Sequence, residues 1–143
     1  MERKIRERMA LLHAVAPGSI GDQLGFELVD CGEDWCLLRC QTAPWMRNPF
    51  GTLHGGMSAA IADQAMGFLA NAVIPEGSLS PTVQMQTVYH APMQPRKPVL
   101  ARVQVTAKSR TLTHLSCQLM MEGAPEKLCV SATSIYYVTE LKK

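Results

Sequence analysis

The apolar run from Met57 to Ile74 constrains the fold most, because it is 18 residues long and contains one charged residue, Asp63. Its polar residues and high alanine content predict a buried helix, since a membrane span needs about 20 more strongly apolar residues. Small side chains occur all round this helix: Ser58, Ala59, Ala60, Ala62, Ala65, Gly67, Ala70 and Ala72. Strands can approach such a helix closely on several sides, which favours a curved sheet wrapped around it.

The rest of the chain predicts the strands of that sheet and one more helix. Apolar spacing indicates an amphipathic helix over residues 2–14, which ends before Pro17-Gly18. Alternating polarity predicts strands over residues 25–31, 34–42, 80–90, 99–107, 111–121 and 128–138. The first two strands are typical of a β-hairpin, and Cys36, Leu38 and Cys40 are expected to face the core. We therefore predict an α+β fold in one domain, residues 1–143, with residues 1–17 as an N-terminal helical extension.

Composition excludes several classes of function. The chain has 143 residues, of which 47% are hydrophobic and 18% charged, so it can build a core and is not disordered. A net charge of +2 is too small for a nucleic-acid-binding surface. The N-terminus mixes charges without an apolar segment, so we expect no signal peptide and a cytoplasmic protein. Five cysteines without a CxxC pair indicate reduced, buried thiols rather than a disulfide framework.

The segment from Asn48 to Gly56 ends where the long helix begins. Free N–H groups and the positive end of the helix dipole make such a terminus suitable for a carbonyl oxygen or an oxyanion. Glycine at 55 and 56 lets a substrate approach the main chain. A P-loop is excluded because Met57 stands where lysine is required, and Ser58 is expected to be an ordinary helix residue because the chain is too short for an α/β-hydrolase. The four histidines lack metal-ligand spacing, so no metal site is predicted.

Asp63 is the strongest candidate for chemistry, because an ionised carboxylate in an apolar helix is costly unless it has a role. Asn48, His54-Gly55-Gly56 and Asp63, at this spacing and followed by four long strands, resemble the hotdog-fold thioesterases of the phenylacetate-degradation (PaaI-like) type. The resemblance covers residues 18–143 and implies hydrolysis of acyl-CoA thioesters. It requires no cofactor, since coenzyme A is part of the substrate.

The resemblance also implies roles for individual residues. The amide of Gly55 would polarise the thioester carbonyl, and Asp63 would act as nucleophile or as base for water. Asn48 and His54 would hold substrate or water, and the hydroxyl of Thr82 would assist.

Helix geometry adds a requirement to this mechanism. Gly55 and Asp63 are eight residues apart, which is about 12 Å along one helix. The thioester carbon must lie roughly 3 Å from the acid while its oxygen reaches the Gly55 amide, which one chain cannot easily provide. Two antiparallel helices in a two-fold dimer can provide it. We therefore expect a homodimer. The resemblance further implies a homotetramer built as a dimer of dimers, and acyl-CoA as the small-molecule partner.

Four cations could hold the phosphates of coenzyme A: Arg96, Lys97, Lys108 and Arg110. Each could equally be a solvated charge in a turn. Ser109 stands where many similar proteins have glycine before the arginine. Two other functions stay open from the sequence. A hotdog dehydratase acting on 3-hydroxyacyl thioesters would use His54 as its base, and a non-catalytic acyl-CoA sensor would keep the pocket without turnover.

Overall fold

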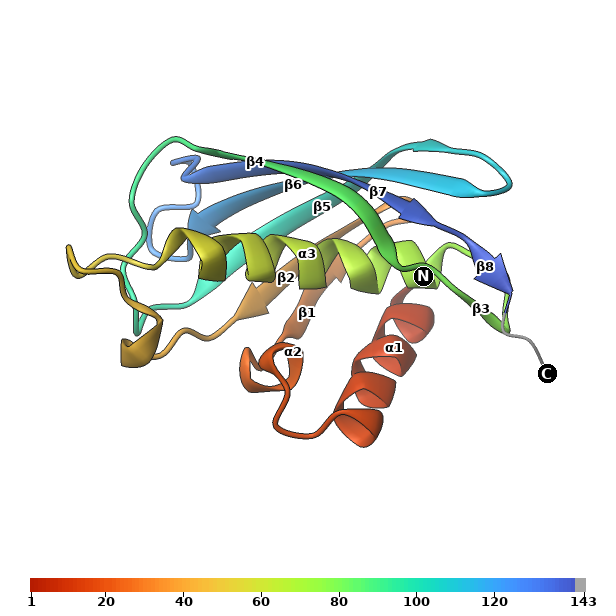
Figure 1. Ribbon diagram of the computed structural model, residues 1–143, viewed down its shortest axis with the longest axis horizontal. Helices are drawn as coiled ribbons and strands as arrows, with labels where there is room; N and C mark the ends of the chain where they lie inside the picture. Colours follow the sequence, from red (N-terminus) through yellow and green to blue (C-terminus); the bar gives the residue numbers. More distant parts are fainter. Residues whose placement is uncertain (141–143) are drawn as a thin grey trace.

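The computed structural model describes residues 1–140 and contains one long helix, two shorter helices and a six-stranded sheet (Figure 1). The helices are α1 (Glu2–Val15), α2 (Ile20–Gln23) and α3 (Gly55–Ala72), with a 3-10 turn η1 (Pro44–Met46) before α3. The six strands are β1 (Glu27–Cys31), β2 (Trp35–Cys40), β4 (Thr82–Tyr89), β5 (Val99–Lys108), β6 (Leu112–Met121) and β7 (Val130–Tyr137). Two short strands, β3 (Ser78–Leu79) and β8 (Thr139–Glu140), pair separately.

The sheet is antiparallel throughout, in the order β1–β2–β5–β6–β7–β4. It curves over α3, which contacts five of its strands, while α1 and α2 pack against α3 beside β1 (Figure 1). The α+β fold with a curved antiparallel sheet on a long helix is confirmed. β4 and β1 are the edges of the sheet, and β4 pairs with β7 alone among the described residues.

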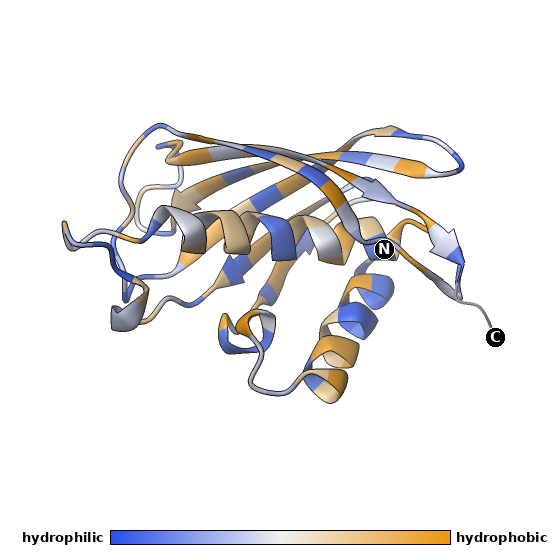
Figure 2. Ribbon diagram, in the orientation of Figure 1, coloured by the Kyte–Doolittle hydropathy of each residue, from blue (hydrophilic) through white to orange (hydrophobic). Residues whose placement is uncertain are grey.

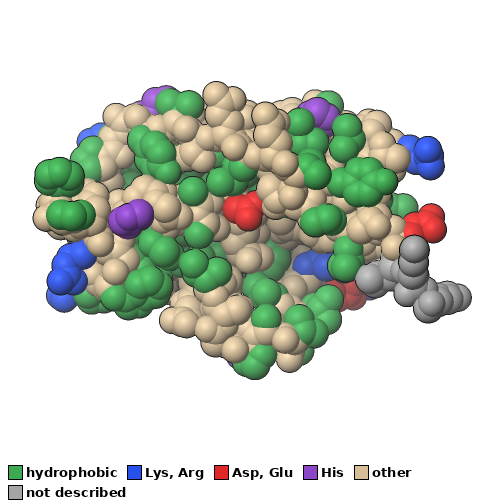
Figure 3. Space-filling model, viewed as in Figure 1, with side chains coloured by type: hydrophobic (Ala, Val, Ile, Leu, Met, Phe, Trp, Pro, Cys, Tyr) green, Lys and Arg blue, Asp and Glu red, His purple; other side chains and the backbone are tan. Residues whose placement is uncertain are grey.

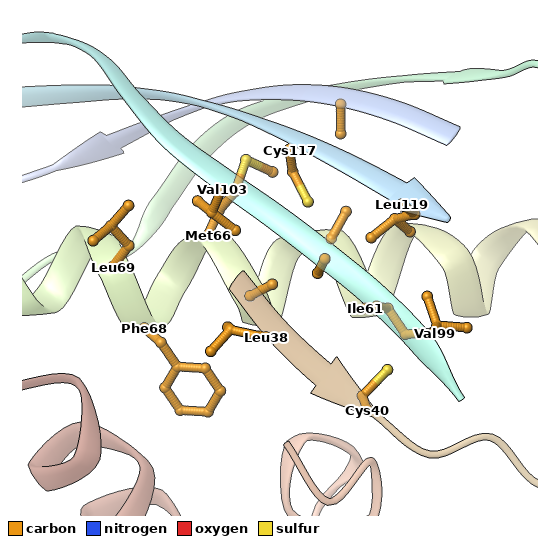
Figure 4. Close-up of a cluster of buried hydrophobic side chains, with 14 of the residues drawn as sticks. Leu38, Cys40, Ile61, Met66, Phe68, Leu69, Val99, Val103, Cys117 and Leu119 are labelled. Atoms are coloured by element: carbon orange, nitrogen blue, oxygen red, sulfur yellow. The ribbon is translucent and has the colours of Figure 1, made fainter. Parts of the chain in front are cut away.

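The core lies between α3 and the concave face of the sheet. Side chains from α3, β2, β5 and β6 point toward one another there (Figure 4). Cys36, Leu38 and Cys40 are fully buried, so their predicted orientation is confirmed. Hydrophobic and hydrophilic residues alternate along the strands, as expected for a sheet with one buried face (Figure 2). Burial raises the pKa of Cys36 and of Cys40 to about 12, so these thiols stay protonated and act as small apolar side chains.

The observed elements differ from the predicted ones mainly at their ends. α3 begins at Gly55 rather than Met57, because the His54 side chain caps the helix, and it ends at Ala72 rather than Ile74. α2, β3 and β8 were not predicted, because two to four residues are too few to show a period. Within residues 1–140, no helix combines the length and the apolar character that a membrane crossing requires.

Candidate active site

The loop that leads into α3 is held in place by Asn48. Its Oδ1 accepts hydrogen bonds from the backbone N–H groups of Phe50 (3.0 Å) and Thr52 (3.1 Å), and its Nδ2 donates to Thr52 Oγ1 (2.8 Å). Gly51 closes the turn with a φ of 81°, a conformation that favours glycine. The position of the helix N-terminus therefore depends on Asn48, and most of the hydrogen-bonding capacity of its side chain is used within the loop.

The N-terminus of α3 has one free donor among its first four N–H groups. The Gly56 N–H donates to His54 Nδ1 (2.9 Å), and those of Met57 and Ser58 donate to the His54 carbonyl (2.9 and 3.1 Å). The N–H of Gly55 has no acceptor within residues 1–140. Of the two glycines, Gly55 is therefore the one whose amide is available to a ligand.

This free amide belongs to a cleft of about 340 Å³. Its walls come from the loop before α3, the first turn of α3, the end of β4 with the segment after it, and the start of β7: Asn48, Thr52, Leu53, Gly55, Ser58, Tyr89, His90, Ala91, Pro92, Met93 and Val130. The Tyr89 hydroxyl donates to the Gly55 carbonyl (2.6 Å) and links the end of β4 to the start of α3. Ser58 is an α3 residue, as predicted, and is 3% exposed.

Asp63 lies in the middle of α3, on a second and separate part of the site. Its Oδ1 accepts hydrogen bonds from the hydroxyls of Thr82 (2.8 Å) and Tyr136 (2.9 Å). The Tyr136 hydroxyl is also 2.8 Å from the Asp63 carbonyl oxygen. Asp63 Oδ2 makes no hydrogen bond or ion pair within the described residues. The carboxylate is half-buried, and its negative charge is stabilised by hydroxyl groups rather than by a cation.

Tyr136 is a hydrogen-bond donor to Asp63, and both of its acceptors, Oδ1 and the carbonyl oxygen, belong to that residue. It is 2% exposed, and burial raises the pKa of its hydroxyl well above the ordinary value, with the charge of Asp63 acting in the same direction. The phenol therefore keeps its proton across the physiological range. A buried tyrosine hydroxyl needs a hydrogen-bond partner, and here that partner is Asp63.

Thr82 reaches Asp63 because β4 contains a bulge. The register between β4 and β7 shifts between Thr82 and Gln84. Met85 and Thr87 are half-buried, so strict alternation would place Val83 on the same side, yet Val83 is 60% exposed and Thr82 bonds to α3. A bulge changes the side to which a side chain points and is common next to active sites.

The structure thus sorts the predicted site residues into two groups. Asn48, His54 and Gly55 lie together at the start of α3, and Asp63 and Thr82 are hydrogen-bonded to each other. The eight residues from Gly55 to Asp63 keep these groups about 12 Å apart along α3.

The four predicted phosphate-binding cations also divide into two pairs. Arg96 and Lys97 belong to the loop between β4 and β5, whose first residues line the cleft, whereas Lys108 and Arg110 lie at the other end of β5, about 30 Å away along the strand. Lys108 Nζ donates to the Val73 carbonyl at the C-terminus of α3, so it has a structural contact of its own.

Two tyrosines of the site were not identified as functional from the sequence. Neither Tyr89 nor Tyr136 is among the predicted site residues. The signal for Tyr136 was present: in β7 it alternates with Val130, Ala132 and Ser134, so its hydroxyl had to point toward α3 and find an acceptor there. Asp63 is the one charged side chain in that helix.

Comparison with known proteins gives a family and a fold. A family model described as the thioesterase superfamily matches residues 50–126, which include the first turn of α3, Asp63 and Thr82. A comparison with curated proteins finds no match.

Solved structures show the same fold at low sequence identity. A thioesterase from Haemophilus influenzae has a TM-score of 0.81 and 24% identity, over 94% of this chain and 92% of that one. A thioesterase related to phenylacetic acid degradation, from Ralstonia eutropha, has a TM-score of 0.80 and 18% identity, over 94% and 98% of the chains. A hypothetical thioesterase from Streptococcus pneumoniae, solved with coenzyme A, has a TM-score of 0.71 and 16% identity, over 83% and 92%.

Proposed function

The chain belongs to the thioesterase superfamily and is a thioester hydrolase, and from this premise we propose that it hydrolyses acyl-CoA thioesters at a site shared between two copies of the chain. The observation that carries the proposal is the separation of two complementary groups on one helix. The free Gly55 amide can stabilise an oxyanion, and the carboxylate of Asp63 can supply the nucleophile, but about 12 Å lies between them.

In the proposed reaction, the thioester oxygen accepts the Gly55 N–H at the positive end of the α3 dipole. A water molecule gives its proton to Asp63 while its oxygen bonds to the thioester carbon, and the electron pair of the carbonyl moves onto the oxygen. When the carbon–sulfur bond breaks, the sulfur leaves with the bonding pair and takes the proton from Asp63. The products are a free acid and the thiol of coenzyme A.

Direct attack by Asp63 is the second chemical route. The carboxylate would bond to the thioester carbon, expel the coenzyme A thiolate and leave a mixed anhydride, which water then hydrolyses. A single turnover in ¹⁸O-labelled water distinguishes the two routes when water attacks the aspartyl carbon of the anhydride, because the label then enters Asp63. In the general-base route, all label enters the free acid.

The surface around α3 supports a second copy of the chain as the missing half of the site. The outward side of α3 carries Asp63 between small residues, Gly56, Ala59, Ala60 and Gly67, which allow another helix to approach closely. Beside it, β4 exposes Val83 and Val88 along an edge that pairs with no other strand of residues 1–140. An exposed apolar edge strand is a surface that proteins normally pair or cover. Hydrophobic and uncharged groups cover most of this face, with one acidic side chain near its middle (Figure 3).

If a two-fold axis passes near the centre of this face, each chain supplies the half of the site that the other chain lacks at that position. Antiparallel α3 helices would bring Gly55 of one copy opposite the carboxylate of Asp63 in the other, and a two-fold dimer would contain two such sites. The cleft beside Gly55 would then receive one substituent of the thioester carbon. We propose Arg96 and Lys97, which follow the cleft along the chain, as contacts for the phosphates of coenzyme A. Coenzyme A in the Streptococcus pneumoniae structure supports this class of substrate.

His54 is poorly arranged to lead a dehydratase reaction. Its Nδ1 accepts the Gly56 N–H, so in the neutral ring Nε2 carries the proton and is a donor. The ring can orient a substrate or a water molecule through Nε2, but neither nitrogen is then free to act as base. Release of free coenzyme A thiol from an acyl-CoA separates the hydrolase from both a dehydratase and a sensor.

Mixed dimers test the shared site. Asp63→Asn and Gly55→Val each remove one half of it, so each variant alone should be nearly inactive. When the two are co-expressed in equal amounts, half of the dimers are mixed, and each mixed dimer has one site with both native residues. Release of coenzyme A should therefore return to about a quarter of the wild-type rate.

The same mixture gives a clear negative result if both groups act within one chain. Every chain then carries one of the two substitutions, and the activity stays at the sum of the separate variants. Differently tagged copies purified in succession confirm that mixed dimers are present. If no mixed assembly forms and the wild-type chain is an active monomer by light scattering, the shared site is wrong.

A further inference from the structure

Both hydroxyl groups that bind Asp63 act on the same carboxylate oxygen. Thr82 Oγ1 is 2.8 Å and the Tyr136 hydroxyl 2.9 Å from Oδ1, and they come from two neighbouring strands, β4 and β7. Oδ2 accepts a hydrogen bond from neither hydroxyl. The carboxylate is therefore asymmetric, with one oxygen held and the other left for an external group.

We propose that Tyr136 is a positioning residue for thioester hydrolysis, and that it and Thr82 bind Oδ1 so that Oδ2 is the reacting oxygen of Asp63. The inference rests on the proposed role of Asp63. It holds for either chemical route, because Oδ2 would take the proton from water in one and would bond to the thioester carbon in the other.

The structure around Tyr136 makes this contact rigid. The side chain is 2% exposed and lies between the sheet and α3, so its ring cannot turn away. Its hydroxyl is also 2.8 Å from the Asp63 carbonyl oxygen, so its single proton lies close to two acceptors of the same residue, Oδ1 and the carbonyl oxygen. Ser134, two residues earlier on the same face of β7, donates to the Gln84 carbonyl (2.7 Å) and ties β7 to β4. A reacting group held by buried neighbours keeps the geometry that catalysis needs.

Hydrogen bonding decides which oxygen reacts. The two bonds to Oδ1 occupy the lone pairs that point toward the protein and stabilise negative charge on that oxygen. Without Tyr136, the carboxylate can rotate and share its one remaining donor between both oxygens, so fewer molecules present Oδ2 correctly. The expected loss is therefore in the chemical step rather than in substrate binding.

Tyr136→Phe tests the proposal because it removes one oxygen atom and keeps the ring in the core. We expect kcat for an acyl-CoA to fall about tenfold while KM changes less than about twofold. Tyr137→Phe is the matched control, since Tyr137 is the next residue of β7, is half-exposed and has no side-chain hydrogen bond within residues 1–140. It should leave both constants unchanged.

A double-mutant cycle separates positioning from a structural role. In an Asp63→Asn background, Tyr136→Phe should cause no further loss of kcat, because the group that it positions no longer reacts. An equal loss in both backgrounds, or a kcat for Tyr136→Phe within twofold of the wild type, would overturn the proposal. The kcat of the wild type, the two single variants and the double variant is also measured with the N-acetylcysteamine thioester of the same acyl group. If the wild type cleaves that thioester but not acyl-CoA, the proposed substrate fails while Tyr136 is still tested.

Discussion

The start of α3 and its middle are two halves of one candidate site, and the chain builds them in different ways. At the start, most hydrogen bonds of the loop from Asn48 to His54 are short-range, and the Gly55 amide has no acceptor within residues 1–140. Two longer-range bonds add to them, from the Leu53 N–H to the Met93 carbonyl and from the Tyr89 hydroxyl to the Gly55 carbonyl. In the middle, Asp63 depends on hydroxyls that are 19 and 73 residues away in the sequence. The first half is mainly local and open to a ligand, whereas the second depends on two strands of the sheet, β4 and β7.

This difference matches the different requirements of a hydrogen-bond donor and of a reacting carboxylate. The Gly55 amide needs only the correct direction, which a helix N-terminus and a tight loop can supply. A carboxylate needs neighbours that stabilise its charge and fix its rotation without neutralising it, and such neighbours come from strands packed on the helix. The two halves should therefore respond differently to substitution.

Asp63→Asn should give the largest effect. The amide oxygen can still accept from Thr82 and Tyr136, so the fold should be retained, with a change in unfolding free energy within about 1 kcal/mol. Loss of the basic and nucleophilic oxygen should lower kcat at least about 10²-fold, while an acyl-CoA still binds. Initial rates of coenzyme A release and calorimetric binding of the substrate measure both effects.

Asp34→Asn is a suitable control for that substitution, because Asp34 is exposed and makes no side-chain hydrogen bond within residues 1–140. Its activity should match the wild type. If Asp63→Asn folds, binds acyl-CoA and hydrolyses it at nearly the wild-type rate, Asp63 has no chemical role and the middle of α3 is only structural.

Gly55→Ala should have a smaller effect, because it moves the donor without removing it. A Cβ atom at this position would lie 3.3 Å from the Tyr89 ring and hydroxyl, closer than ordinary contact. The ring or the helix end must shift, and the new methyl group hinders the thioester. We expect kcat/KM to fall between about tenfold and a hundredfold, less than the loss of a whole oxyanion donor.

Gly123→Ala provides the comparison for the glycine, since an added Cβ there has no neighbour within 4 Å. It should leave kcat/KM unchanged. Normal kinetics for Gly55→Ala would mean that the thioester oxygen does not approach this amide. The remaining helix N–H groups are already bonded, so the oxyanion would then require a donor from elsewhere.

The two halves also differ in how far they could be predicted from the sequence. The loop and the glycines at the start of α3 could be predicted, because most of their contacts are local and their residue types are specific. Asp63 stood out as the sole charge of α3. The alternating polarity of the strands and the long apolar, alanine-rich run of α3 predicted the α+β fold, since each shows which surfaces are buried.

The surroundings of Asp63 could not be predicted in the same way. The bulge in β4 depends on pairing with β7, and it reverses the alternation that the sequence indicates around Thr82. The family resemblance alone identified Thr82 as a candidate. The alternation along β7 indicates that Tyr136 is buried, but it does not show that its hydroxyl contacts Asp63. Register and cross-strand contacts arise from the complete sheet, whereas a sequence pattern reports one strand at a time.

Arg96→Gly should have the smallest effect on activity. It tests whether Arg96, which follows the cleft beside Gly55 along the chain, contacts a phosphate of coenzyme A. Arg96 has a φ of 70°, which costs a residue with a side chain roughly 1–2 kcal/mol, whereas glycine adopts it freely. Relief of this strain should stabilise the folded state, and the greater flexibility of glycine in the unfolded chain offsets part of that stabilisation. The unfolding free energy should therefore rise by less than about 1 kcal/mol. Loss of one exposed cation should raise KM for acyl-CoA about threefold and leave KM for an N-acetylcysteamine thioester unchanged.

Lys108→Met is the comparison for Arg96→Gly, because Lys108 lies at the opposite end of β5. Lys108 already donates to the Val73 carbonyl, so its loss should lower the unfolding free energy by about 0.5 kcal/mol. If Lys108 only caps α3, KM for acyl-CoA stays at the wild-type value. A rise that equals that of Arg96→Gly, and that disappears at high salt, would place both ends of β5 near the phosphates. In an antiparallel dimer that result has a simple cause, because the far end of one chain's α3 then lies beyond the open cleft of the other chain.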